Sequence, residues 1–427
     1  MNEMMIFEAA RYVPIVKAYI DPGTGSMLFT VLIGLISVVA YGFKGLWIKL
    51  KTLSGKTSKK DNKKLPIIIY TDSKRYWNIF KPICDEFEKL KFTVYYYTQS
   101  SDDPAFIENY QYVKREFIGE GNKGFTKMNF LNADIVLSST PSLDVYQWKR
   151  SKNVKHYSHI WHVVRDATVY RMFGVDYFDS LLLTGNYQVD QIRKLEELRN
   201  IPKKECKVVG CVYMDEMKNR LANAVKNKND NKTILLAPSW GPSSIFVKYG
   251  SHIIDELIKT GYHIILRPHP QSYISDKKVI KEIMDKYPET NQLEWNKEND
   301  NFDVLNRADL LISDFSGVIY DFALVFDKPI IYADTSFDKS IYDACWLDEE
   351  MWTFTTLRNI GERLDSDNIT NIKELIDNCL SNPRYKQGRD KARQEAWQNQ
   401  GKATEDVVKF LIDKYNKLEA EDNKCNY

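Results

Sequence analysis

The stretch from residue 309 to residue 332 constrains the fold most, because its pattern predicts a strand, a turn, a helix and a second strand in direct succession. Leu310 to Ile312 is a short apolar run of the kind found in buried parallel strands. Val318 to Phe326 is apolar on nearly every side, which predicts a buried helix. Pro329 ends that helix, and residues 330–332 begin the next strand. This succession predicts an α/β protein with parallel sheets.

The turn between that strand and that helix has the composition of a phosphate site. Free backbone N–H groups at a helix start attract anions, and the hydroxyls of Ser313 and Ser316 lie beside them in the sequence. Gly317 would let an anion approach the main chain closely. The alternative is a plain N-cap at Ser316 and a tight turn at Gly317. Asp314 and Asp321 are ambiguous, since Asp321 falls in an apolar helix and must be paired with a ligand or with the protein's own backbone.

A second strand end carries cationic groups. The apolar strand that starts at Tyr262 runs directly into Arg267 and His269, each next to a proline. Ligands in open α/β sheets lie beyond the carboxyl ends of strands. Arg267 can bind phosphate oxygens through two N–H groups, and His269 can donate a hydrogen bond to a phosphate or leaving-group oxygen. A surface loop stiffened by prolines is the alternative.

Together these two elements resemble the CDP-glycerol glycerophosphotransferase family of teichoic-acid synthesis. The resemblance rests on Arg-Pro-His-Pro at 267–270, Ser-Asp-Phe-Ser-Gly-Val-Ile-Tyr-Asp-Phe at 313–322 and Asp-Lys-Pro-Ile at 327–330, and it extends in weaker form from about Leu65 to Val408. It implies the GT-B architecture, in which two Rossmann-like domains face each other. It also implies a CDP-glycerol donor held mainly by the C-terminal domain, and catalysis without a divalent metal or other cofactor.

Length, charge and cysteine content exclude several classes of protein. A chain of 427 residues is long enough for two domains with their own cores. A formal net charge of +2 gives no basis for nucleic-acid binding. The cysteines include no Cys-x-x-Cys pair, so we expect free thiols in a reducing compartment and no structural zinc. They are Cys84, Cys206, Cys211, Cys345, Cys379 and Cys425.

An apolar run near the N-terminus predicts a membrane anchor. After an N-terminal segment at 1–26, residues 27–48 are long and apolar enough for a spanning or re-entrant helix. The basic linker at 49–64 then predicts that everything after it lies on the cytoplasmic side of the cell membrane. A cleaved signal peptide and an interfacial helix are the alternatives. The lysines of this linker are Lys49, Lys51, Lys56, Lys59, Lys60, Lys63 and Lys64.

From Leu65 onward, alternating strands and helices predict two Rossmann-like domains. They are expected at 65–226 and 232–370, and the resemblance implies that the first binds the acceptor and the second binds the donor. The polar stretch 227–232 is the predicted linker. After Tyr332 we expect no further strand, and closing helices at 371–427, which in GT-B proteins cross back to the first domain. The segment around Ser239 resembles the family's Ala-Pro-Thr-Trp segment, where side chains reach the donor.

The densest histidine cluster, at 156–162, predicts a strand whose end presents one histidine. It lacks the spacing and the nearby carboxylate or cysteine of a zinc site. The resemblance implies that His162 is the general base. The family's polymerases follow that histidine with Gly-Thr-Pro, whereas this chain has Val163-Val-Arg165. Arg165, Asp166 and Arg171 could hold a phosphorylated acceptor or pair with each other on the surface.

The predicted reaction is transfer of glycerol phosphate, or a related polyol phosphate, from a CDP-activated donor to a hydroxyl of a lipid-linked acceptor. His162 would take the hydroxyl proton, and the cations and hydroxyls at 267–269 and 313–317 would hold the pyrophosphate as CMP leaves. A GT-B glycosyltransferase that uses a nucleotide sugar and a non-catalytic membrane scaffold are the alternatives. The pattern leaves open whether glycerol phosphate, ribitol phosphate or a sugar is transferred, and it leaves the oligomeric state open.

Overall fold

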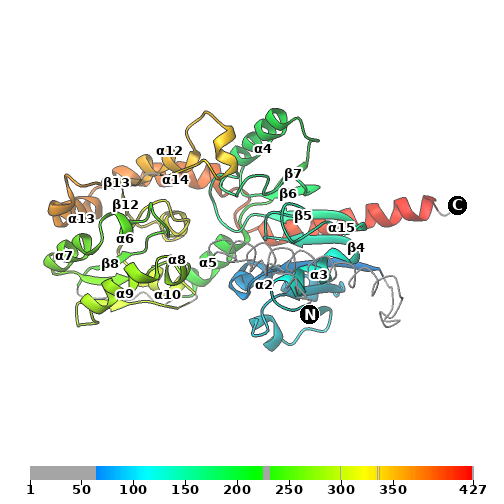
Figure 1. Cartoon of the computed structure of the whole chain (residues 1–427), viewed down its shortest axis with the longest axis horizontal. Helices are drawn as coiled ribbons and strands as arrows, with labels where there is room; N and C mark the ends of the chain where they lie inside the picture. Colours follow the sequence, from blue (N-terminus) through cyan, green and yellow to red (C-terminus); the bar gives the residue numbers. More distant parts are fainter. Residues whose placement is uncertain (1–63, 225–230, 299, 334, 336, 426–427) are drawn as a thin grey trace, which may run out of the picture. The chain divides into compact units, whose positions relative to one another are not determined.

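The first domain is built on a parallel sheet of seven strands in the order β3-β2-β1-β4-β5-β6-β7. The computed structural model describes residues 64–224, 231–298, 300–333, 335 and 337–425 (Figure 1). The central strands are apolar and fully buried, as a sheet covered on both faces requires. The strands are β1 (Leu65–Thr71), β2 (Val94–Thr98), β3 (Val113–Phe117), β4 (Asn132–Ser138), β5 (Asn153–Ile160), β6 (Ser180–Leu183) and β7 (Glu205–Val208).

Helices and short turns connect these strands in the right order for a doubly wound sheet. The chain goes from β1 outward to β3, and then returns to β4 on the other side of β1. This reversal makes the crevice beyond the carboxyl ends of β1 and β4 a ligand-binding position. The connecting elements are η1 (Lys74–Tyr76), α2 (Trp77–Lys89), η2 (Pro104–Ile107), α3 (Asn122–Asn129), α4 (Asn186–Arg199) and α5 (Val212–Ala222).

The second domain has a parallel sheet of six strands in the order β10-β9-β8-β11-β12-β13. Its inner strands are again continuous apolar runs buried on both faces. The strands are β8 (Thr233–Leu236), β9 (His263–Leu266), β10 (Leu293–Trp295), β11 (Leu310–Ser313), β12 (Ile330–Ala333) and β13 (Gly361–Leu364). The helices before β12 are α6 (Ile245–Lys248), α7 (Ser251–Lys259), α8 (Ser272–Ser275), α9 (Lys277–Lys286), α10 (Phe302–Arg307) and α11 (Val318–Tyr320), with a π-helix, η3 (Asp321–Val325), directly after α11.

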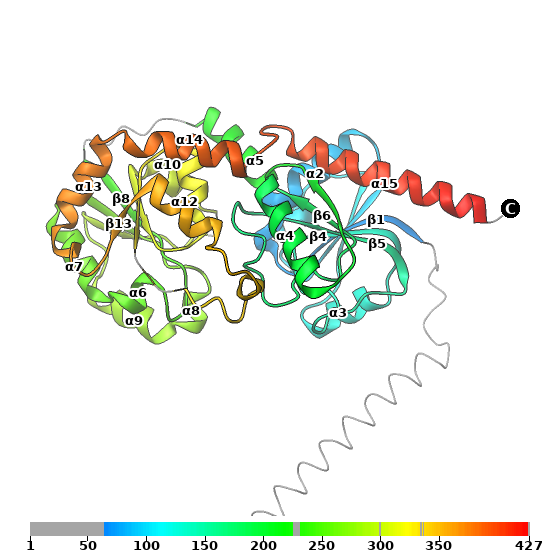
Figure 2. The ribbon, with the colours of Figure 1, turned by 90° about the horizontal axis from the view of Figure 1, so that it is seen from above.

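The C-terminal helices close the second domain and return to the first. Figure 2 shows α15 running beside the first sheet, where Val407, Val408 and Leu411 pack into the same core as Ile67 and Phe80. This is the return that the GT-B resemblance implies. The remaining elements are η4 (Asp343–Trp346), α12 (Trp352–Ile360), η5 (Ile369–Asn371), α13 (Ile372–Ser381), α14 (Arg384–Ala396) and α15 (Ala403–Cys425).

The predicted α/β fold with two parallel-sheet, Rossmann-like domains is confirmed, and two details were wrong. The expectation of no strand after Tyr332 missed β13, a four-residue edge strand whose two charged residues hide its pattern. The predicted regular helix from Val318 to Phe326 is a single α-turn followed by the π-helix. The predicted anchor at 27–48 and most of the linker at 227–232 lie outside the described residues. Within the described ranges, no helix is long and apolar enough to cross a membrane.

Candidate active site

The loop that follows β5 touches the turn that follows β11. His162 and Val163 come directly after the end of β5. A Cβ placed on Gly317 would lie 2.7 Å from Val163 Cγ2, so a methyl group of the first domain fills the space beside a glycine of the second. Both segments follow the carboxyl ends of parallel strands, where ligands bind in α/β proteins. The contact therefore brings the predicted base next to the predicted phosphate turn.

His162 is held mainly by ring packing. Its ring meets the Tyr76 ring edge-on, with centroids 5.0 Å apart and planes at 62°. Its Nδ1 is buried and finds no hydrogen-bond partner among the described residues. Burial, followed by the charges of Arg165 and Arg75, lowers the pKa of His162 to about 3. His162 is therefore unprotonated at neutral pH, which is the form that a general base requires.

His269, in the loop after β9, is a neutral hydrogen-bond donor. The backbone N–H of Gln271 donates to Nδ1 of His269 at 3.1 Å, which assigns the proton of the neutral ring to Nε2. Burial lowers the pKa of His269 to about 4, and the charges of three arginines act in the same direction. They are Arg75, Arg267 and Arg165. Since Arg75 and Arg165 belong to the first domain, positive charge from both domains converges on His269.

These three arginines make their closest contacts with uncharged groups of the described residues. Arg165 donates to the carbonyl of Val169 at 3.1 Å, and Arg267 donates to the neutral amide oxygen of Asn296. Arg75 is exposed and stacks over a tyrosine ring. Across the described chain, none of the three forms an ion pair. Three cations without an ion pair, which act on two neutral histidines, suit a polyanion such as a pyrophosphate.

Ser313 and Asp314 were predicted to bind the donor phosphates, and the structure gives both a structural role instead. The hydroxyl of Ser313 is fully buried and donates to the carbonyl of Ala237 at 2.6 Å, which ties β11 to the end of β8. The buried carboxylate of Asp314 accepts the N–H groups of Ser239 at 2.9 Å and Ile245 at 3.1 Å. The Ser313 hydroxyl and the Asp314 carboxylate are therefore already used in hydrogen bonds within the protein. Their effect is to shape the loop that carries Ser239, which itself is almost completely buried.

The turn at Ser316 and Gly317 leaves less space for a phosphate group than the sequence predicts. Ser316 is half-buried at the start of α11, which has only three residues before the π-helix. The free space expected beside Gly317 is occupied by Val163. The backbone of Gly317 is helical, with φ −58°, so the glycine is required by close packing and not by its conformation. A ligand phosphate thus depends more on the arginines than on this helix start.

Asp321 lies in the π-helix and is isolated from water. It is 5% exposed, and its Oδ1 has no hydrogen-bond partner within the described residues. Burial raises the pKa of Asp321 to about 7, with Asn301 opposing that shift. Its charge acts on Tyr213 and Cys211 at the start of α5. The surroundings of Asp321 thus include the start of α5.

The two predicted acceptor arginines have different surroundings in the structure. Arg165 lies at the site, where it affects both histidines. The side chain of Arg171 is exposed, and its backbone forms an isolated antiparallel bridge with Tyr342. Asp166 pairs with neither arginine, because its buried carboxylate accepts the N–H groups of Trp352 and Thr353 at 2.8 Å each. Asp166 is thus an N-terminal cap on α12, supplied by the other domain.

Sequence reasoning missed Arg75 and Tyr76. They form part of η1, directly after β1, at the point where the strand order reverses. The available signal was an apolar strand that runs into a polar segment with a cation, the same signal that pointed to Arg267.

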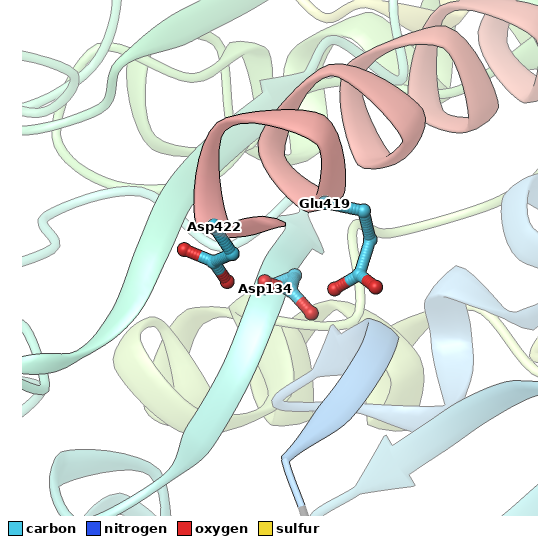
Figure 3. A group of neighbouring side chains, drawn as sticks. All are labelled: Asp134, Glu419 and Asp422. Atoms are coloured by element: carbon cyan, nitrogen blue, oxygen red, sulfur yellow. The ribbon is translucent and has the colours of Figure 1, made fainter. Parts of the chain in front are cut away.

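A separate acidic cluster lies near the amino end of β4, the central strand of the first sheet. Figure 3 shows Asp134, near the start of β4, facing Glu419 and Asp422 of α15, a spacing that could suit a metal ion. Lys155 and Lys64 already pair with both aspartates. The two ammonium groups offset most of the negative charge, so the cluster is a salt-bridge network that attaches α15 to the sheet.

Two Rossmann-like domains that share a site at their strand ends define a two-domain enzyme of the GT-B type. The family profile of CDP-Glycerol:Poly(glycerophosphate) glycerophosphotransferase matches residues 192–413, which is more than half of the chain. The chain belongs to this family. A search of curated proteins found no match.

Solved structures show the same fold at low sequence identity. The structure of the wall teichoic acid polymerase TagF matches with a TM-score of 0.57 and 18% identity, over 90% of this chain and 99% of that one. A variant of TagF soaked with CDPG matches with a TM-score of 0.55 and 16% identity, over 90% and 98% of the two chains. The UDP-GlcNAc 2-epimerase of Methanocaldococcus jannaschii, in complex with UDP-GlcNAc and UDP, matches with a TM-score of 0.52 and 16% identity, over 82% and 99%.

Proposed function

We propose that this protein transfers glycerol phosphate from CDP-glycerol to a hydroxyl of a lipid-linked cell-wall or capsule polymer and releases CMP. Membership of the family supports the donor and the type of reaction. The observation that carries the proposal is the contact of Val163 with Gly317, because His162 directly precedes Val163 and Gly317 lies in the turn predicted to bind phosphate. The base and the leaving group's cations then come from opposite domains, as a transfer between two bound substrates requires.

On the donor side, the pyrophosphate would lie among the arginines. Its two negative charges match the unneutralised charge there, and Arg267 can bind two oxygens at once. Nε2 of His269 carries the proton of the neutral ring and can donate it to an oxygen of the departing CMP. Preformed donors of this kind stabilise the charge that develops in the transition state.

On the acceptor side, His162 would accept the proton of the attacking hydroxyl. The acceptor oxygen forms a bond to the distal phosphorus, and the bond from that phosphorus to the oxygen of CMP breaks. A pKa near 3 makes the free ring a weak base. Bound pyrophosphate would offset the charges of Arg75 and Arg165, and this would raise the pKa of His162. The base thus gains strength when the donor is in place.

The membrane part of the proposal depends on the sequence alone. The apolar run at 27–48 and the lysines that follow it favour an anchored protein with its catalytic domains on the cytoplasmic side. There the soluble donor and a lipid-linked acceptor would both be within reach. This segment lies outside the described residues.

The test is nucleotide release from the full-length protein, purified in detergent. CDP-glycerol, CDP-ribitol and nucleotide sugars would each be supplied with and without membrane lipids. We expect CMP from CDP-glycerol only with lipid acceptor, and a loss of roughly a hundredfold or more in both His162→Ala and His269→Ala. His252→Ala is the matched control, because His252 lies on α7 with its side chain 51% exposed.

Each other outcome selects a different function. Release of a nucleoside diphosphate from a sugar donor would establish glycosyl transfer. CMP from CDP-ribitol alone would keep the reaction and change the transferred group. No release from any donor, together with tight nucleotide binding, would establish a scaffold.

A further inference from the structure

Arg75 lies beyond the carboxyl end of β1, where the strand order of the first sheet reverses. It lies in η1, four residues after the end of β1 at Thr71. β1 pairs with β2 on one side and β4 on the other, and the chain reverses its direction across the sheet there. Groups beyond the carboxyl ends of strands at such a reversal face bound ligands in doubly wound sheets. Arg267 likewise lies just beyond the carboxyl end of a parallel strand, β9, in the second domain.

A stack of side chains connects Arg75 with the predicted base. The guanidinium carbon of Arg75 lies 5.0 Å from the centre of the Tyr76 ring. The Tyr76 ring in turn meets the His162 ring, with centroids 5.0 Å apart. Arg75 is exposed, whereas Tyr76 and His162 are half-buried. The charged end of Arg75 is therefore held near the base while it stays open to a ligand.

The charge of Arg75 is available to a ligand. The neighbouring Lys74, in contrast, forms an ion pair with Asp102. Arg75 acts on the carboxyl group of Asp72, whose pKa is raised by burial although the charge of Arg75 opposes that shift. No described carboxylate lies within ion-pair distance of Arg75. Its charge lowers the pKa of His162 in the first domain and that of His269 in the second.

We propose that Arg75 contacts the phosphate group that is transferred, as a cation supplied by the first domain. This inference rests on the proposed phosphotransfer. As the acceptor oxygen bonds to the distal phosphorus and the bond to CMP breaks, the oxygens of that phosphate stay negatively charged. Arg75 would hold these oxygens beside His162, while Arg267 and His269 would hold the phosphate that leaves with CMP. The two phosphates of the donor are thus bound by different domains.

This division predicts how nucleotide binding responds to substitution of Arg75. CDP carries both phosphates, and CMP carries only the one that leaves. In the full-length protein, we expect Arg75→Gln to weaken CDP binding about tenfold, as for loss of one charge-assisted hydrogen-bond pair, and to leave CMP binding unchanged. Isothermal titration calorimetry with CDP, CMP and inorganic pyrophosphate measures this directly.

Arg384→Gln is the matched control. Arg384 is exposed and stacks over the ring of the next residue, Tyr385, at the same 5.0 Å as Arg75 over Tyr76, but it lies at the start of α14. The Arg384→Gln variant should bind CDP, CMP and inorganic pyrophosphate as tightly as the wild-type protein does. In turnover, Arg75→Gln should lower kcat by roughly a hundredfold, and Arg75→Lys should recover part of that loss. A role confined to packing on Tyr76 would not separate CDP from CMP.

The outcomes distinguish this inference from the proposed function. If CDP and CMP bind and Arg75→Gln changes both equally, or neither, the inference is overturned while the proposed donor stands. If the wild-type protein binds pyrophosphate through Arg75 but neither cytidine nucleotide, the phosphate contact stands and the proposed function falls. If none of the three ligands binds, both are overturned.

Discussion

Asp166 caps a helix that belongs to the other domain: its Oδ2 accepts the backbone N–H of Thr353 at 2.8 Å and the Thr353 hydroxyl at 2.6 Å. Its Oδ1 accepts the N–H of Trp352 at 2.8 Å and the side-chain amide of Gln191 at 2.6 Å. Asp166 comes four residues after His162 and is fully buried. One carboxylate thus fixes the start of α12 and the loop that carries the base.

Substitution of Asp166 should destabilise the protein. Asp166→Ala removes a helix cap and leaves buried N–H groups without acceptors, and we expect a loss of about 2 kcal/mol or more in the free energy of unfolding. Urea denaturation followed by circular dichroism measures it. Asp367→Ala, at an exposed position, should change the midpoint little. Equal midpoints for both variants would contradict the cap.

Gly317 should tolerate no side chain while Val163 is present. A Cβ on residue 317 would lie 2.7 Å from a methyl of Val163, and a β-branched side chain has little freedom to move. Because the backbone at Gly317 is helical, Gly317→Ala should cause a steric clash without backbone strain. We expect it to lower kcat/KM for CMP release by about tenfold or more.

The double variant Gly317→Ala with Val163→Ala tests the cause of that loss. It should recover much of the activity that Gly317→Ala loses, because it removes the clashing methyl groups. If the double variant instead loses as much activity as the two single variants together, the contact with Val163 is not the reason for the glycine.

The pH dependence of catalysis should follow the positive charge around His162. Its pKa is about 3 with Arg75 and Arg165 present, so protonation should not limit kcat/KM near neutral pH. Arg165→Gln removes one charge and should move the acidic limb of the kcat/KM profile to higher pH. Measurement of the profile from about pH 3 to pH 8, after controls for stability, tests this. An acidic limb that stays in place would exclude Arg165 as a cause of the shift.

Buried histidines should make the protein less stable in acid. His159 is fully buried, accepts or donates one hydrogen bond with the Tyr170 hydroxyl at 3.0 Å, and has its pKa lowered well below the ordinary value by burial. An unfolded chain binds a proton at His159 near pH 6.5, but the folded protein does not. Stability from this group is therefore complete above about pH 6.5 and falls as the pH decreases.

The free energy of unfolding should depend less steeply on pH in His159→Gln than in the wild-type protein. The slope should be smaller by up to about 1.4 kcal/mol per pH unit between pH 6 and pH 5, whatever the substitution does to stability at pH 8. Urea midpoints at several pH values measure the slope. An unchanged slope would mean that His159 is protonated in the folded state. His252→Gln, exposed on α7, is the control.

The succession of strands and helices along the chain and the two strand ends that bear cations could be predicted because they depend on local pattern. The runs that became β9 and β11 are continuously apolar, and a parallel strand buried on both faces has that pattern. The short edge strand β13 was not predicted, because four residues with two charges do not form an apolar run. The predicted anchor and its side of the membrane stay predictions.

The sequence by itself determined the α/β class, the family and the positions of Arg267, His269 and His162, since each follows from an apolar run with a motif at its end. Only the tertiary structure decided which polar groups remain free for a ligand. Ser313 and Asp314 match the motif, yet their hydrogen bonds are used by β8 and the loop after it. Arg75 belongs to no motif, yet the reversal at β1 brings it to the histidines. Hydrogen-bond partners and neighbouring charges come from segments far apart in the chain, and only folding brings them together.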